Sequence, residues 1–92
     1  MTQKEIAQKQ LDAGTILCKY GIVAIRVEFT HACAAEEFAI DYDAEFHGDI
    51  MVAVIAKGEC ITVAGETITH YSWLEKLFAG LLDHAIESIE IM

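Results

Sequence analysis

A run of alternating residues from Glu37 to His47 constrains the fold of this chain more than any other segment. Its even positions are apolar: Phe38, Ile40, Tyr42, Ala44 and Phe46. Its odd positions are mostly acidic: Glu37, Ala39, Asp41, Asp43, Glu45 and His47. Because side chains alternate between two faces in a β-strand, the pattern predicts an extended segment with an apolar inner face and an acidic outer face. No Lys or Arg occurs between Arg26 and Lys57, so no neighbouring base in the sequence neutralises that acidic face.

Further strands are predicted from alternation and from apolar runs between glycines. Ile22 to Thr30 alternates cleanly, and Ile50 to Ala56 is apolar on both faces, as in a central strand that is covered on each side. Cys60 to Ala64 predicts a fourth strand, and Thr67 to His70 is a candidate to pair back onto it. The turns are expected at Gly48-Asp49, Gly58-Glu59 and Gly65-Glu66.

Two capping boxes predict the helices. Thr2 and Glu5 open the first, which ends either before Gly21 or near Asp12 with a strand that starts at Thr15. Ser72 and Glu75 open the last helix, and its apolar residues recur at three and four positions from Trp73 to Ile89. The segment from 31 to 36 is expected to be a connection, either irregular or a short helical turn.

These elements predict a single compact α+β domain over residues 1–92. The expected order is α-β-β-β-β-α, with an antiparallel four-stranded meander sheet and the N-terminal and C-terminal helices packed on one face. Asp41, Asp43 and Glu45 would then line the open face beside Arg26 and Glu28. The order resembles that of double-stranded RNA-binding domains. Their last helix begins with a lysine-rich segment, whereas this chain has Ser72-Trp73-Leu74-Glu75, so the resemblance implies an element order and no RNA binding.

The charge of the chain limits its partners. Fifteen acidic against six basic residues give a formal charge of −9, which disfavours direct binding of nucleic acid or an anionic membrane and favours a basic protein surface. The N-terminus lacks the apolar segment of a signal peptide, and the longest apolar run, residues 50–56, is too short to span a bilayer. Three irregularly spaced cysteines form no disulfide framework. We therefore expect a cytoplasmic protein.

The acidic segment is the candidate binding site. A rigid row of carboxylates that imitates backbone phosphates would occupy the nucleic-acid site of a basic protein and block it. In size and charge the chain resembles the small acidic inhibitors that phages make against restriction or CRISPR machinery. The expected contact has a core of Asp41, Asp43 and Glu45 and a rim of Glu28, Glu36, Glu37 and Asp49. Two alternatives stay open: a solvated acidic face that suppresses edge-to-edge pairing, and a site for a hard cation.

Other functions find less support in the sequence. A transition-metal site would draw on His31, Cys33, Cys60 and His70, but no zinc-ligand spacing is present. The chain has no phosphate-binding loop or nucleophile motif, so we expect a non-enzymatic protein without a cofactor. An oligomeric structural subunit, such as a homodimer that meets through the last helix and the strand at 50–56, is a further alternative.

Overall fold

The structure is a computed structural model that describes residues 1–46, 52–66 and 72–92. The described residues form three helices and four strands: α1 (Gln3–Tyr20), β1 (Ile22–Phe29), α2 (Ala32–Glu45), β2 (Val52–Lys57), β3 (Cys60–Glu66), α3 (Ser72–Leu81) and β4 (Ile86–Ile91). All strand pairs in the sheet are antiparallel. The predicted α+β class with a four-stranded antiparallel sheet is therefore confirmed.

The sheet is not the predicted meander. Its strand order is β2-β3-β1-β4, and α2 and α3 connect β1 to β2 and β3 to β4. Each of these βαβ connections places its two strands on either side of a third, which is the split βαβ, or ferredoxin-like, topology. The predicted order α-β-β-β-β-α, and with it the element order of double-stranded RNA-binding domains, is wrong because a helix occupies residues 32–45.

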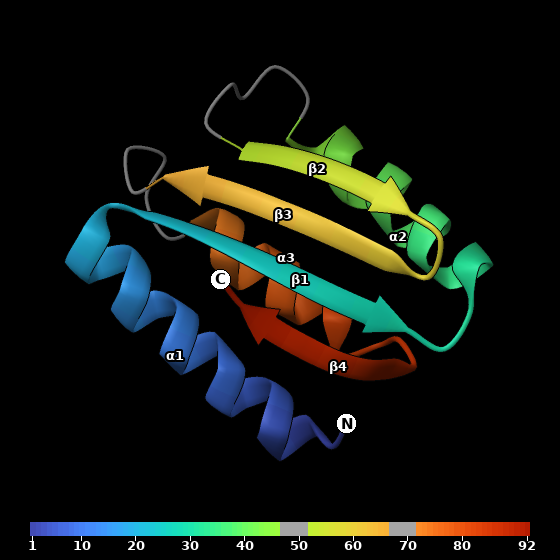
Figure 1. Cartoon of the computed structure of the whole chain (residues 1–92), viewed down its shortest axis with the longest axis horizontal. Helices are drawn as coiled ribbons and strands as arrows, with labels where there is room; N and C mark the ends of the chain where they lie inside the picture. The colour runs from blue at the N-terminus through green and yellow to red at the C-terminus, as the bar shows by residue number, and fades with distance from the viewer. Residues whose placement is uncertain (47–51, 67–71) are drawn as a thin grey trace.

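Helix α1 precedes this unit and is capped as the sequence predicts. The Thr2 hydroxyl accepts from the Glu5 backbone N–H at 3.2 Å, and the Glu5 carboxylate accepts from the Thr2 N–H at 3.3 Å. Gly21 ends the helix in the left-handed conformation, with a φ of 77°. The alternative ending near Asp12 is wrong. Figure 1 shows α1 along the β4 side of the sheet, where it packs against β1, β4 and α3.

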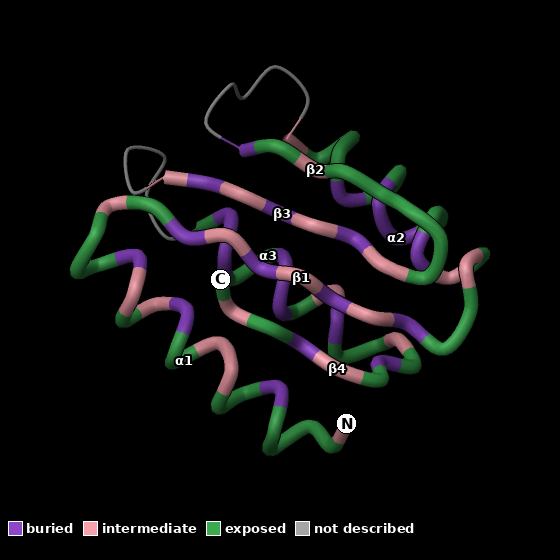
Figure 2. The backbone as a smooth tube through the Cα atoms, viewed as in Figure 1, coloured by how far each residue is buried: buried purple, intermediate pink, exposed green. Residues whose placement is uncertain are grey.

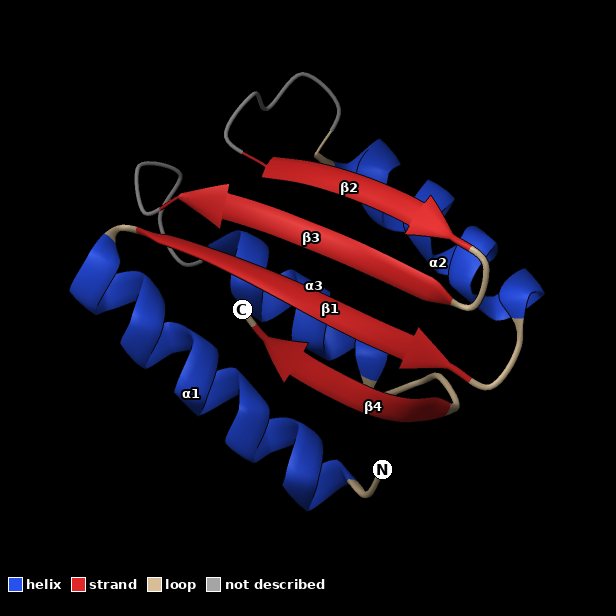
Figure 3. Cartoon of the chain, viewed as in Figure 1, coloured by secondary structure: helices blue, strands red, loops and turns tan. Residues whose placement is uncertain are grey.

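Strand β1 shows how the sheet divides into two faces. Val23, Ile25, Val27 and Phe29 are buried, and the residues between them are half-buried. Figure 3 shows α2 and α3 behind the sheet, and the Phe29 ring lies 5.5 Å from the ring of Phe38 on α2. The other face, which bears Arg26 and Glu28, therefore points away from α2.

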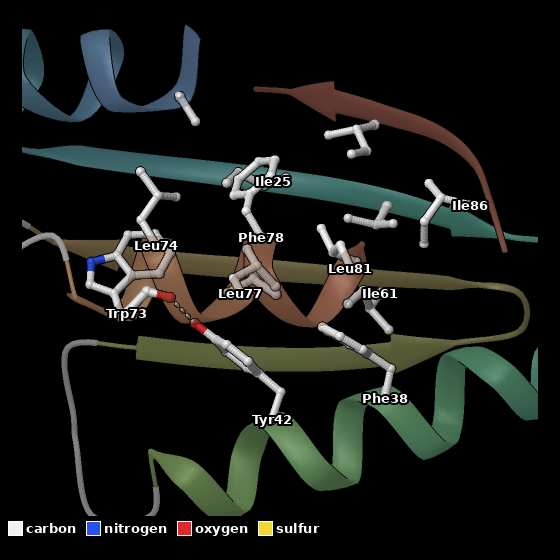
Figure 4. Close-up of a cluster of buried hydrophobic side chains, with 14 of the residues drawn as sticks. Ile25, Phe38, Tyr42, Ile61, Trp73, Leu74, Leu77, Phe78, Leu81 and Ile86 are labelled. Atoms are coloured by element: carbon white, nitrogen blue, oxygen red, sulfur yellow. Dashed lines mark hydrogen bonds between the residues drawn. The ribbon is translucent and has the colours of Figure 1, made fainter. Parts of the chain in front are cut away.

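Helix α3 supplies Trp73, the largest fully buried side chain among the described residues. Figure 4 shows its apolar residues directed at the sheet and α2, and Trp73, Leu77, Phe78 and Leu81 have no exposed surface. The Tyr42 hydroxyl donates to the Trp73 carbonyl oxygen at 2.9 Å. A Cβ on Gly65 of β3 would lie 2.7 Å from the Trp73 ring, so this glycine is a packing position within a strand rather than the predicted turn. Most of the apolar stripe that was a candidate dimer contact is thus buried inside the chain, whereas Leu82 is 42% exposed.

Two other predictions are corrected at the ends of the sheet. The last helix stops at Leu81 rather than continuing to Ile89, and residues 86–91 form β4, whose Ile86 and Ile89 are buried. The strand predicted at Ile50–Ala56 is β2, which is an edge strand and not a central one. Figure 2 shows it largely exposed.

The expected turn at Gly48-Asp49 and the pairing of Thr67–His70 lie outside the described residues, whereas the turn at Gly58-Glu59 is confirmed.

Candidate protein-interaction surface

The predicted acidic strand at residues 37–47 is the greater part of helix α2, and His47 lies outside the described residues. The helix buries one side of itself: Ala35, Phe38, Ala39, Tyr42. These positions are three and four residues apart, which is the spacing of a helix packed on a core. Five alanines and three glutamates among fourteen residues favour a helix, and aspartate is depleted in strands.

The acidic residues of α2 are exposed, as predicted, but they do not lie on one common face. Helix α2 carries no basic residue. Its five acidic residues are all exposed: Glu36, Glu37, Asp41, Asp43, Glu45. At 3.6 residues per turn, Asp41 and Asp43 lie about 200° apart around the axis. The predicted row of Asp41, Asp43 and Glu45 on one face is therefore wrong.

A different row replaces it. Glu37, Asp41 and Glu45 are spaced at four residues, so they lie on one side of the helix with a rise of about 6 Å between neighbours. We call these three residues the acidic stripe. Glu36 and Asp43 lie on the other flank of the exposed side, and Ile40, which is 70% exposed, lies with them.

The rest of the predicted rim is not part of this surface. Glu28 lies on the open face of the sheet, where its carboxylate accepts from the Ser88 hydroxyl at 3.3 Å. Arg26 lies on that same face, so neither residue is beside the α2 acids. Asp49 lies outside the described residues.

The acidic stripe is almost uncompensated. Among residues 1–46, 52–66 and 72–92, its ion pairing is limited to Lys76 Nζ on α3, which lies 4.0 Å from Glu45 Oε1. Both side chains are about half exposed, and exposed pairs of this kind contribute about 0–1 kcal/mol. The Lys76 ammonium also lies 5.3 Å from the centre of the Phe46 ring. The surface thus retains most of its negative charge.

The helix is electrostatically unfavourable as it stands. The helix dipole favours acidic residues in the first turn and basic residues in the last turn. The first turn of α2 has no acidic residue, and its last turn has no basic residue and ends at Glu45. The stripe also contains two like-charge pairs at four-residue spacing, Glu37–Asp41 and Asp41–Glu45. The N-cap residue of α2, His31, makes no side-chain capping hydrogen bond. The like-charge pairs and the placement of the charges along α2 are therefore unfavourable for the helix itself.

Each flank of α2 borders a hollow. Between α2 and α3 lies a cavity of about 190 Å³, lined in part by Asp41, Glu45 and Lys76. Between α2 and β2 lies a groove of about 300 Å³, which we call the edge groove: Glu36, Ala39, Ile40, Asp43, Val54, Ala56. Neither the groove nor the exposure of Ile40 was predicted from the sequence. The helical spacing of residues 35–42 is the signal that would have placed Ile40 on the acidic side.

The candidate metal ligands do not assemble in the part of the chain that the structure describes. No three His, Cys, Asp or Glu side chains there are grouped as a metal site would require. Cys33 is exposed at the start of α2, and the Cys60 sulfur accepts from Arg26 Nη2 at 3.0 Å. His70 lies outside the described residues.

A scan against protein-family models and searches of curated proteins and of solved structures found no match to this chain. Within the described residues, none of the helices combines the length and the apolar composition needed to cross a bilayer.

Proposed function

We propose that this chain is a non-enzymatic interaction protein that binds a basic, nucleic-acid-handling protein and blocks its nucleic-acid site. The acidic stripe of α2, Glu37, Asp41 and Glu45, is the core of the contact, with Glu36 and Asp43 beside it. The observation that carries the proposal is the stripe itself. Three exposed carboxylates lie on one side of a helix, and within the described residues their ion pairing is limited to the long contact between Glu45 and Lys76.

The density of charge on α2 fits this role. From Glu36 to Glu45 the helix rises about 13.5 Å, so its five carboxylates provide about one charge per 3 Å of axis. Along one strand of DNA there is one phosphate per ~3.4 Å. A cleft that recognises a phosphate backbone with Lys and Arg meets this linear charge where it surrounds the whole exposed side of the helix, and one carboxylate per about 6 Å where it contacts the stripe alone.

The unfavourable placement of these charges also supports binding. A solvated face that served only solubility would gain from acids in the first turn and bases in the last. Here two like-charge pairs and a poorly matched dipole are kept on one exposed surface. Such a surface gains its stabilisation when a cationic partner covers it. An inhibitor of a restriction or CRISPR nuclease is one kind of protein that would act in this way.

The experiment is capture of the partner followed by displacement of nucleic acid from it. The wild-type chain and the variant Glu37→Gln/Asp41→Asn/Glu45→Gln are used as baits in a host lysate at low salt. A matched control, Glu59→Gln/Glu87→Gln/Glu90→Gln, removes the same charge from exposed positions elsewhere. The protein retained is purified, and its release of a labelled oligonucleotide is titrated with each chain.

We expect the wild type and the control to displace the oligonucleotide, the stripe variant to be at least tenfold weaker, and wild-type binding to fall steeply with salt. The proposal fails if all three chains retain the same protein equally, or if that protein holds the chain and the oligonucleotide at the same time.

A further inference from the structure

Strand β2 is an unprotected sheet edge. Within the described residues it pairs with β3 alone, and the register of that pair is continuous from Val52 to Lys57 without a bulge. In an antiparallel pair, alternate residues direct their N–H and C=O groups at the partner strand and the others direct them outward. Natural proteins usually guard such an edge with proline, charges or a bulge. Five of the six residues of β2 are uncharged and apolar, and only Lys57, at the end of the strand, is charged.

The edge groove lies beside this strand. Val54 and Ala56 line it from β2, and Ala39 and Ile40 line it from α2. Ile40 is 70% exposed and Ile55, on the other face of β2, is 65% exposed. A strand added along β2 would therefore meet two different faces: the groove with its two carboxylates on one side, and the apolar Ile55 on the other.

The charges that line the edge groove favour a cationic segment over a second copy of the chain. Glu36 and Asp43 are the polar residues that line it, and both are exposed carboxylates. A second copy of the chain that paired through β2 would bring its own Glu36 and Asp43 to the same contact, and each chain carries a charge of −9. Like charges that face each other across an interface oppose association. A cationic segment gains from the same two carboxylates.

We infer that the edge groove and the outer edge of β2 bind an extended segment of the partner protein, with alternating apolar and basic residues, as a fifth strand of the sheet. Main-chain hydrogen bonds to β2 supply affinity, and the side chains over the groove supply specificity, as in other cases of β-strand addition. The basic side chains of the segment reach Glu36 and Asp43. The inference rests on the proposed function for the charge of the partner, and it adds where and in what conformation that partner binds.

The test uses a synthetic probe, the blocked peptide Lys-Val-Arg-Val-Lys-Val-Arg. Two control peptides replace its central valine with proline or its basic residues with glutamate. Binding to the intact chain is measured by calorimetry, and amide hydrogen exchange in β2 is followed by NMR with and without peptide. The variant Glu36→Gln/Asp43→Asn is compared with Asp41→Asn/Glu45→Gln, which removes the same charge from the opposite flank of α2.

We expect the probe to slow exchange at alternate amides of β2, and both control peptides to bind at least tenfold more weakly. Glu36→Gln/Asp43→Asn should weaken the probe severalfold more than Asp41→Asn/Glu45→Gln does. The inference is overturned if the probe does not bind, if it binds without protecting β2, or if the proline peptide binds as well. It is also overturned if β2 becomes protected without peptide as the protein concentration rises, because the occupant is then a second copy. If one of these results is obtained and the stripe variant still fails to retain the captured partner, the inference about β2 fails and the proposed function does not.

Discussion

Neutralising the acidic stripe should stabilise the protein. In Glu37→Gln/Asp41→Asn/Glu45→Gln, the loss of two like-charge pairs gains about 0.4–1 kcal/mol. Removal of an anion from the last turn of α2 gains about 0.3–1 kcal/mol. Loss of the pair between Glu45 and Lys76 at 4.0 Å costs roughly 0–1 kcal/mol because both side chains are about half exposed. Taken at the middle of each range, these contributions raise the free energy of unfolding by about 1 kcal/mol.

The measurement is thermal unfolding followed by circular dichroism at low and high salt. For a domain of this size, ~1 kcal/mol shifts the Tm by about 4–8 °C. The gain should shrink in 1 M salt, where the Debye length is about 3 Å. Glu75→Gln is a control of opposite sign, because Glu75 is in the first turn of α3, where an anion is favourable. A stripe variant that is less stable than the wild type, or a gain that salt leaves unchanged, would refute the electrostatic argument for α2.

Two further predictions concern packing and capping. Gly14→Ala should stabilise the protein by about 0.5–1 kcal/mol, because the new Cβ meets no atom within 4 Å in α1. Gly80→Ala should destabilise it by about 1–3 kcal/mol in urea denaturation, because the new Cβ would lie 2.9 Å from the Phe38 ring; equal effects at the two glycines would contradict the packing of α2 on α3. Hydrogen bonds from the Thr2 backbone and side chain lower the pKa of Glu5. The ionised Glu5 carboxylate therefore stabilises the fold above the ordinary glutamate pKa, and this stabilisation is lost as the pH falls through the lower pKa of the folded state. Thr2→Ala removes the hydroxyl that donates to the Glu5 carboxylate and keeps the backbone N–H, so it should raise the Glu5 pKa in an NMR titration and should lower the Tm more at pH 7 than at pH 3. An unchanged Glu5 pKa would show that the Thr2 hydroxyl does not donate to the Glu5 carboxylate.

The sequence could predict the elements whose signals are local and repeated. The capping box at Thr2, the glycine at position 21 and the clean alternation of β1 each fixed one feature, and the structure confirms all three. The start of α3 at Ser72 was also correct. These features depend on neighbouring residues, so tertiary contacts were not needed to place them.

The acidic segment shows where a periodic pattern fails. Over Glu37–His47 the apolar residues satisfy a period of two, but Phe38 and Tyr42 also satisfy a period of four, and Ala35 and Ala39 extend that helical spacing toward the N-terminus. An interpretation that began at Glu37 left out the alanines of residues 32–35, which carry the helix propensity. The length of the segment and its composition, rather than alternation, decide between the two structures.

The ends of the sheet depend on contacts that the sequence does not state. Residues 86–91 continue the apolar spacing of α3, and no glycine or proline separates them from it. The helix ends where the His84 Nδ1 lies 2.9 Å from the Gly80 carbonyl oxygen and the chain turns so that Ile89 pairs with Val27. Strand β2 looked central because it is apolar on both faces. One of those faces borders α2 and the other is exposed, which is a tertiary distinction.

The change from strand to helix also changes what the acidic residues can bind. A strand would have presented Asp41, Asp43 and Glu45 to one partner surface at one spacing. The helix separates the five carboxylates into the stripe, which borders α3, and the pair Glu36 and Asp43, which borders β2. Because the exposed Ile40 lies with that pair, this flank combines an exposed apolar side chain with charge and suits a peptide. The three side chains of the stripe are all carboxylates and suit a phosphate-binding cleft. One helix thereby provides two surfaces whose substitutions can be separated, and a basic protein with an extended segment near its nucleic-acid site could engage both at once.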